Sequence, residues 1–267
     1  MPGERPRTKA RARAALRRNR AARTAAALYR HRGCGPHDVI LASYPKSGNT
    51  WLKFLLADVL LDSEPDFERS ERAIPLLGRT AAGAAPLPGG GHLWKSHEPY
   101  SPLYRRRCPR AIYLVRDARD VAISEYHFLQ RKGRFAGDLG RFLELFLAGR
   151  ADGYGSWDDH VRSFTAGWRG ESEGRIVVRY EDMLADPAGA LAGVLGILAV
   201  AAPPERVALA VARNSFAGMR AKEVVVAGKT PQVRAGRAGQ WQSEFTAAQR
   251  ERFWSALPQL RHMGYEA

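Results

Sequence analysis

The fold is decided by one stretch at the start of the globular region, VILASYPKSGNTW, which occupies residues 39–51. Its first four residues are apolar and predict a buried strand, and a helical pattern follows over residues 50–61. A turn containing Pro45, Lys46 and Gly48 joins the two. Backbone N–H groups at the start of such a helix converge on an anion, and the helix dipole adds to their field. The stretch therefore predicts a phosphate-binding loop.

The side chains of this loop suit an anion. Gly48 permits close backbone approach, Lys46 brings a positive charge, and Ser47, Asn49 and Thr50 offer hydrogen bonds. The lysine precedes the glycine, so the loop does not have the GxxxxGK[ST] pattern of ATP-dependent kinases. A Pro-Lys-Ser-Gly turn is equally typical of an ordinary surface turn, and a P-loop phosphotransferase or kinase stays open as an alternative.

Strand and helix patterns alternate along the rest of the chain. Apolar runs predict strands before Lys95 and over residues 111–115 and 175–180. Helical patterns cover residues 120–132, 157–168, 187–199 and 204–213, and residues 62–91 predict a surface segment with one short helix. Alternation of this kind predicts an α/β fold, P-loop-like, with a central mainly parallel sheet in a three-layer α/β/α arrangement.

The positive charge is concentrated at the N-terminus. The chain has 267 residues and a formal net charge of +15, and residues 1–32 hold eleven Arg or Lys residues against one acid, Glu4. We therefore expect a basic, disordered or loosely helical segment at 1–35 and one domain at 36–267. A solvated tail is more typical of such a segment than a nucleic-acid-binding arm, which stays an alternative.

Cysteine usage and hydropathy narrow the class of protein. Cys34 and Cys108 are the two cysteines, and they form neither a disulfide framework nor a zinc motif. The longest apolar stretch, residues 190–202, is shorter than the roughly 20 residues that span a bilayer. The N-terminus lacks the apolar core of a secretory signal. We expect a cytoplasmic protein with no transmembrane segment and no metal.

Several segments carry a resemblance to a known family. SYPKSGNTW at 43–51 resembles the 5'-phosphosulfate-binding motif of sulfotransferases that use 3'-phosphoadenosine 5'-phosphosulfate (PAPS), and YLVRDARDVAISEYHF at 113–128 is similar to their 3'-phosphate-binding segment. Similar segments follow in the family's order at 154–161, 180–183, 215–216, 234–241 and 245–246. The resemblance covers residues 38–256, and several ordered motifs are more specific than one. It implies a cytosolic-type enzyme of class EC 2.8.2.

The resemblance also implies which residues bind the donor and its product, adenosine 3',5'-bisphosphate. They are Lys46, Ser47, Gly48, Asn49, Thr50, Trp51, Arg116, Ser124, Tyr180, Ser215, Phe216, Arg234, Ala235 and Gly236. Among them, Trp51 and Phe216 would stack on adenine, and Arg116 and Ser124 would hold the 3'-phosphate. Taken alone, Arg116 is as well explained by a structural ion pair with Asp117 or Asp120, and Phe216 by core packing.

The segment LWKSHEP at 93–99 resembles the family's Lys-Thr-His motif and supplies the expected chemistry. A hydroxyl acceptor must lose its proton, and an imidazole suits that task, so His97 is the predicted general base and Glu98 the alternative. Lys46 and Lys95 would neutralise charge at the transferred group. By the resemblance, Ser124 would hold Lys46 away until the acceptor binds.

The chain departs from the family pattern at several positions. Asn49 replaces a common threonine, and Ala235 stands where a lysine is usual. The family's dimer motif is degraded, because Gln242, Thr246, Ala247 and Glu251 stand where Lys, Thr, Val and Glu are expected, so both a monomer and a homodimer stay open. We expect a hydroxyl or amine of a small-molecule, natural-product or lipid acceptor as the partner, and no nucleic acid.

Overall fold

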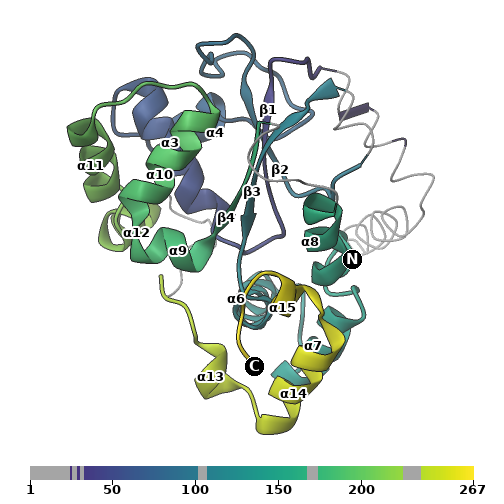
Figure 1. Ribbon diagram of the computed structural model, residues 1–267. Helices are drawn as coiled ribbons and strands as arrows, with labels where there is room; N and C mark the ends of the chain where they lie inside the picture. The colour runs from purple at the N-terminus through teal and green to yellow at the C-terminus, as the bar shows by residue number, and fades with distance from the viewer. Residues whose placement is uncertain (1–24, 26–28, 31–32, 102–106, 167–173, 225–235) are drawn as a thin grey trace, which may run out of the picture.

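A four-stranded parallel sheet forms the centre of the molecule. The computed structural model describes residues 25, 29–30, 33–101, 107–166, 174–224 and 236–267 (Figure 1). The strand order is β2-β1-β3-β4, with β1 at Val39–Ser43, β2 at Leu93–Ser96, β3 at Arg110–Val115 and β4 at Arg175–Arg179. All three strand pairings are parallel, as predicted. The predicted basic segment 1–35 lies mostly outside the described residues.

Helices cover both faces of the sheet, which completes the predicted three-layer arrangement (Figure 1). One group consists of α3 (Asn49–Leu61), α4 (Phe67–Ala73), α9 (Tyr180–Ala185), α10 (Pro187–Ile197), α11 (Pro204–Arg213) and α12 (Phe216–Val224). The other group consists of α6 (Ala118–Arg131), α7 (Leu139–Leu147), α8 (Trp157–Thr165), α13 (Trp241–Glu244), α14 (Ala247–Ala256) and α15 (Gln259–His262).

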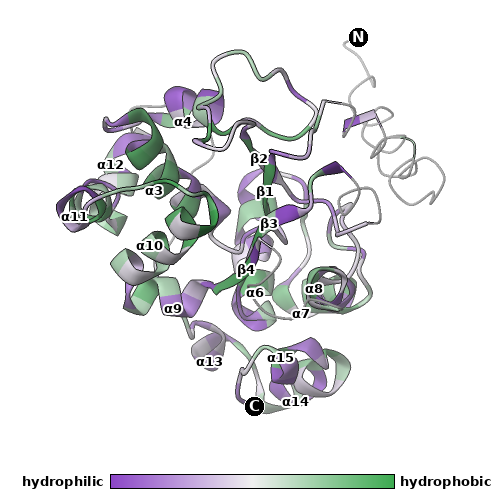
Figure 2. Cartoon of the chain, turned by 45° about the horizontal axis from the view of Figure 1, so that its top comes forward, coloured by the Kyte–Doolittle hydropathy of each residue, from purple (hydrophilic) through white to green (hydrophobic). Residues whose placement is uncertain are grey.

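Alternating strand residues feed two separate cores. Val39 and Leu41 of β1 belong to the core against α3 and α10, whereas Ile40 and Ala42 belong to the core that includes α7 and α8. A strand buried on both faces is apolar at every position, which explains the uninterrupted apolar run in the sequence. Figure 2 shows the strands and the inner faces of the helices in the hydrophobic colour, with hydrophilic residues toward the outside.

The structure adds to the predicted elements and corrects one of them. Helices α7, α9, α12, α13, α14 and α15 were not predicted. Tyr180 was predicted to end a strand, but the strand ends at Arg179 and Tyr180 begins α9. The reason is that Arg179 is the extended N-cap residue of α9, so helical geometry begins at Tyr180, and the residue pattern over 175–180 does not mark that boundary. Within the described part of the chain, no helix is long and apolar enough to cross a bilayer.

Candidate active site

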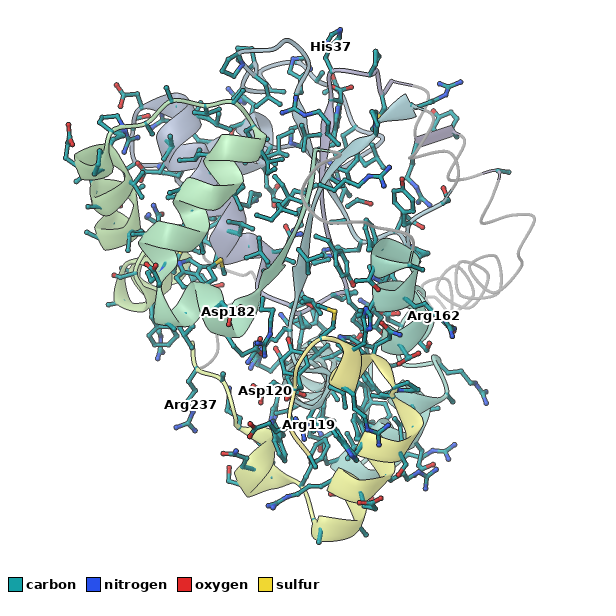
Figure 3. The ribbon with its side chains drawn as sticks, viewed as in Figure 1. His37, Arg119, Asp120, Arg162, Asp182 and Arg237 are labelled. Atoms are coloured by element: carbon teal, nitrogen blue, oxygen red, sulfur yellow. The ribbon has the colours of Figure 1, made fainter. Side chains whose placement is uncertain are left out.

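The segments that follow the strands line one pocket of about 420 Å³. Parallel strands end at the same edge of a sheet, and ligands of open α/β sheets bind there. In Figure 3, His37 before β1 lies at the opposite end of the sheet from Arg119 and Asp120, which follow β3. Lys46, His97 and Arg116 come from three different strand ends, and all three line the pocket.

The loop after β1 has the geometry of an anion cradle. Gly48 is the N-cap residue of α3 with φ 98°, and its position provides no side-chain cap for the helix. A Cβ atom on Gly48 would lie 2.5 Å from the Tyr180 ring, so the backbone approaches more closely than any other residue would allow. Lys46 also has a left-handed backbone, with φ 66°. The Asn49 Oδ1 atom is buried and has no hydrogen-bond partner among the described residues, although its Nδ2 donates to Ser43 Oγ at 3.0 Å.

Two aromatic side chains from distant segments line the same pocket. Trp51 is fixed by its indole N–H, which donates to the Asn214 carbonyl at 2.8 Å, and its ring meets the Tyr180 ring edge-on at 6.1 Å. Phe216 is 38% exposed. Gly236 lies directly against the Phe216 ring, since a Cβ atom there would clash with it. An exposed aromatic ring at a pocket is available for stacking on a flat ligand.

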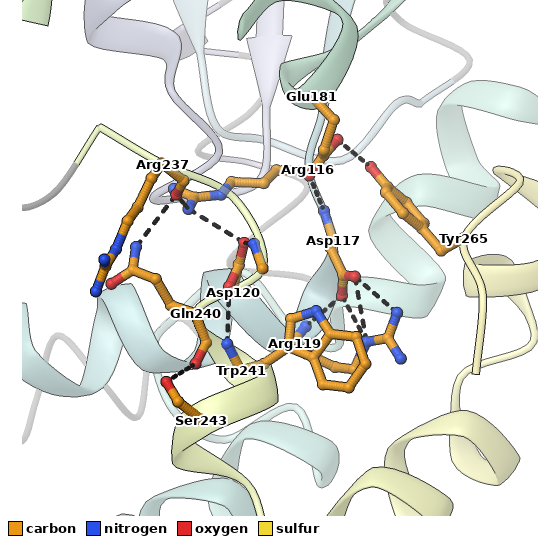
Figure 4. A network of polar contacts seen from close by, with 11 residues as sticks. Arg116, Asp117, Arg119, Asp120, Glu181, Arg237, Gln240, Trp241, Ser243 and Tyr265 are labelled. Carbon is orange, nitrogen blue, oxygen red and sulfur yellow. Dashed lines mark hydrogen bonds and ion pairs between the residues drawn. The ribbon is translucent and has the colours of Figure 1, made fainter. Parts of the chain in front are cut away.

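Arg116 is buried at the pocket and only partly satisfied by the protein (Figure 4). Its Nη2 donates to the Arg237 carbonyl at 3.0 Å and to Asp120 at 3.4 Å, and its guanidinium lies over the Tyr180 ring at 4.3 Å. The expected structural ion pair with Asp120 is therefore present, and the one with Asp117 is not among the described contacts. The Nε atom has no partner among the described residues, so the arginine retains a buried donor for a ligand.

A second network holds the Arg116 segment in place (Figure 4). Asp120 accepts N–H groups from Gly239 at 2.8 Å and from Trp241 at 3.2 Å, which fastens the loop before α13 to α6. Asp117 receives the Arg119 guanidinium at 2.8 Å, and that guanidinium also lies 3.6 Å from the Trp241 ring centroid. Burial raises the pKa of Asp117, against the opposing effect of Arg119. These buried charges position the pocket wall.

His97 has the tautomer that a proton acceptor requires. Its Nδ1 lies 2.8 Å from the Ser43 carbonyl oxygen and donates to it, which leaves Nε2 unprotonated. Burial, with Lys95 as the next cause, lowers the pKa of His97 to about 3. Glu98, the alternative base, is paired with Arg30 at 2.7 Å and is not among the pocket residues. The geometry favours His97.

The two lysines bring positive charge to the same region. Burial lowers the pKa of Lys46 to about 8 and also lowers that of Lys95. The Lys46 ammonium lies 4.2 Å from the centroid of the Phe128 ring. Ser124 lines the pocket, but the described contact of the Lys46 ammonium is with Phe128, and the predicted hold of Ser124 on Lys46 stays a prediction.

Not every predicted residue reaches the pocket. Thr50, Tyr180 and Gly236 line it, whereas Ser47 and Ser215 do not. Ser47 lies within the loop and is fully buried, and Ser215 is exposed with its hydroxyl accepting the Gly218 N–H at 3.3 Å. Arg234 and Ala235 lie outside the described residues.

Several pocket residues were given no role from the sequence. They are Pro45, Glu125, Phe128, Leu129, Arg134, Asp152, Tyr154, Leu184, Met219 and Gln240. Most come from α6, from the loop before α8 or from helices on the other side of the sheet. Several of them lie inside the quoted motifs, but the motifs give them no role, because only the folded chain brings them together. Among the described residues, a possible metal-ligand group, Cys34, Asp38 and Cys108, does not line this pocket.

Comparisons with known proteins identify the family. The sulfotransferase domain matches residues 36–262. The chain belongs to the sulfotransferase domain family. It is 32% identical to sulfotransferase 1 family member D1 of Rattus norvegicus over 247 residues, covering 82% of this chain and 81% of the relative. It is also 32% identical to sulfotransferase 1A1 of Bos taurus over 249 residues, with coverage of 82% and 81%.

A solved sulfotransferase has the same fold. Mouse sulfotransferase SULT7A1, whose crystal structure is a complex with PAP, superimposes with a TM-score of 0.64 at 25% identity and covers 82% of this chain and 81% of its own. Retinol dehydratase superimposes with a TM-score of 0.66 at 20% identity, covering 90% of this chain and 84% of its own, which supports the fold alone. These findings confirm the predicted family, the fold class and the assignment as a PAPS-dependent sulfotransferase.

Proposed function

We propose that the strand-end pocket binds PAPS and transfers its sulfuryl group in line to a hydroxyl or amine of a small acceptor, with His97 as the general base. One observation carries the proposal: Lys46 and Arg116, from separate motifs predicted to hold opposite ends of the donor, line the same pocket. Had they lain on different sides of the molecule, one nucleotide could not have contacted both.

The residues present fit the donor. The glycine cradle at Gly48 leaves no room for a Cβ atom, the buried Nε of Arg116 lacks a partner among the described residues, and Phe216 exposes its ring. An arginine fork suits a phosphate, and an aromatic face suits adenine. These features support binding of a nucleotide that carries a phosphate at each end.

The donor supplies an activated sulfuryl group on a phosphate leaving group, and this chain supplies the charges and the base. Lys46 and Lys95 offer positive charge in a buried site, where fixed charge lowers a barrier more effectively than in water. His97 accepts the acceptor proton at Nε2 while Ser43 holds Nδ1–H. We expect the pKa of His97 to rise when anionic groups enter, because they offset the field of Lys95.

We propose further that the catalytic unit is residues 36–267 with a basic appendage at 1–35, and that the protein works in the cytoplasm as a monomer or homodimer without nucleic acid or metal. The dimer motif is degraded at Gln242 and Ala247, so the motif does not decide between monomer and homodimer. Sedimentation analysis distinguishes the two states.

The proposal is tested by calorimetry and transfer together. We expect the full chain to bind adenosine 3',5'-bisphosphate more tightly than adenosine 5'-monophosphate, and to move labelled sulfate from PAPS to a hydroxyl compound from host extract. Preferential binding of ATP with magnesium would favour the kinase alternative and reject the proposal. If deletion of residues 1–32 removed all function, the nucleic-acid arm would be favoured instead.

A further inference from the structure

The pocket contains two carboxyl groups from different segments, one buried and one half-buried. Glu125 follows Ser124 on α6 and is 3% exposed, and Asp152 comes from the loop before α8. Both line the pocket together with His97. An acceptor whose hydroxyl faces His97 therefore shares one pocket with this pair.

The two carboxyl groups interact with each other. The side chains of Glu125 and Asp152 lie close enough to interact, and two neighbouring carboxyl groups disfavour double ionisation and so favour sharing one proton. The Glu125 Oε2 atom is buried and receives no N–H or hydroxyl donor from any described residue. Burial and the neighbouring Asp152 raise the pKa of Glu125 well above its usual range, against the smaller effects of Lys46 and Arg134. The arrangement therefore favours one proton shared by the pair, which a better donor could replace.

The surrounding structure fixes this pair in place. Asp152 Oδ1 accepts the Tyr154 backbone N–H at 2.6 Å, and the Tyr44 hydroxyl donates to the Gly155 carbonyl at 3.1 Å. The loop carrying Asp152 is thereby tied to the end of β1. Two aromatic rings, Phe128 and Tyr154, line the pocket beside it, and the face of an aromatic ring attracts a cation.

We propose that the acceptor carries a protonated amine, which binds between Glu125 and Asp152 while the hydroxyl of the same acceptor faces His97. This inference rests on the proposed function. The ammonium group replaces the shared proton, so binding releases one proton to solvent and leaves two carboxylates paired with a cation. The acceptor class is thus an amino alcohol, an aminophenol or an amino sugar. An acceptor with a carboxylate would instead favour Arg134, which is exposed at the pocket.

The first test measures binding and needs no turnover. Tyramine, 6-aminohexan-1-ol and glucosamine are titrated by calorimetry into the complex of the full chain with adenosine 3',5'-bisphosphate, in buffers of different ionisation enthalpy. We expect at least one amine to bind with release of about one proton at neutral pH, and its N-acetyl counterpart to bind about 10- to 100-fold more weakly, the range for a charged hydrogen bond. If no amine binds a complex that does hold the bisphosphate, this inference fails and the proposed function stands. If the bisphosphate itself does not bind, the proposed function fails.

The second test uses Glu125→Gln, which keeps the size and neutral charge of the protonated side chain and should fold. We expect this variant to lose the preference for the amine over its N-acetyl counterpart, and the proton release with it. Glu251→Gln, which alters an exposed carboxylate on α14, is the matched control and should retain both. A preference for 4-hydroxyphenylacetate over tyramine, or an amine preference unchanged in Glu125→Gln, would overturn the inference.

Discussion

The two ends of the pocket differ in charge and in how the chain builds them. The proposed donor end uses Lys46 and Arg116, which follow β1 and β3, and Lys95, the next-to-last residue of β2. The proposed acceptor end uses Glu125 and Asp152, which come from the middle of α6 and from a loop. On these proposed assignments, the chain recognises the co-substrate mainly through residues at strand ends, whereas recognition of the acceptor depends on segments that the fold brings together from elsewhere.

Removing the base at the junction of the two ends should have the largest effect. His97→Ala is expected to lower kcat by about 10²–10⁴-fold, as for loss of a general base, because the acceptor keeps its proton during attack. Affinity for adenosine 3',5'-bisphosphate should change little, since His97 serves the acceptor. The measurements are steady-state turnover and calorimetry. A variant that turns over normally would contradict the role of His97.

The pH dependence provides a control for the same residue. Because the pKa of His97 is lowered to about 3, the imidazole stays neutral as the pH falls below its ordinary value of 6.5. Protonation of His97 in the free enzyme should therefore not reduce kcat/KM between pH 6.5 and pH 3. In the complex with the donor the pKa of His97 should be higher, so kcat should begin to fall at a higher pH than kcat/KM. The lowered pKa also makes the free energy of unfolding depend on pH. The contribution of neutral His97 to that free energy is complete above pH 6.5 and is lost as the pH falls toward 3. A kcat/KM limb near 6.5 would contradict the burial argument.

Arg116 tests the donor end alone. Arg116→Ala should weaken adenosine 3',5'-bisphosphate binding by about 10- to 100-fold, the range for hydrogen bonds to a charged group. Arg116→Lys keeps the charge but loses the fork, so it should fall between the wild type and Arg116→Ala. Replacing Arg116 by Ala removes one partner of Asp120, although Asp120 keeps its N–H donors from Gly239 and Trp241. Thermal unfolding of the variants therefore shows whether a loss of stability contributes to the loss of affinity. Equal loss of affinity for adenosine 5'-monophosphate would show that Arg116 does not read the 3'-phosphate.

The same contrast explains what the sequence could predict. The parallel sheet, the cradle at Gly48 and the placement of Lys46 and Arg116 follow from local patterns, because each motif couples a strand end to a helix start. The C-terminal helices were missed because α14 has no strong apolar periodicity and is held by single contacts such as buried Phe253. Glu125 stands inside a quoted motif, yet its role depends on Asp152, and no spacing in the chain shows that these two side chains meet.

The smallest predicted effect concerns the ring that borders solvent. Phe216→Ala should weaken adenosine 3',5'-bisphosphate binding by about fivefold, near the low end of base stacking at roughly 1 kcal/mol, because the ring is 38% exposed. Leu209→Ala on α11 is the matched control: that side chain is 42% exposed and does not line the pocket, so affinity should not change. Calorimetry on both variants separates stacking from a general effect of removing exposed apolar surface. Equal affinities for the two variants would mean that Trp51 carries the stacking alone, and that the donor end depends on its charges more than on its aromatic walls.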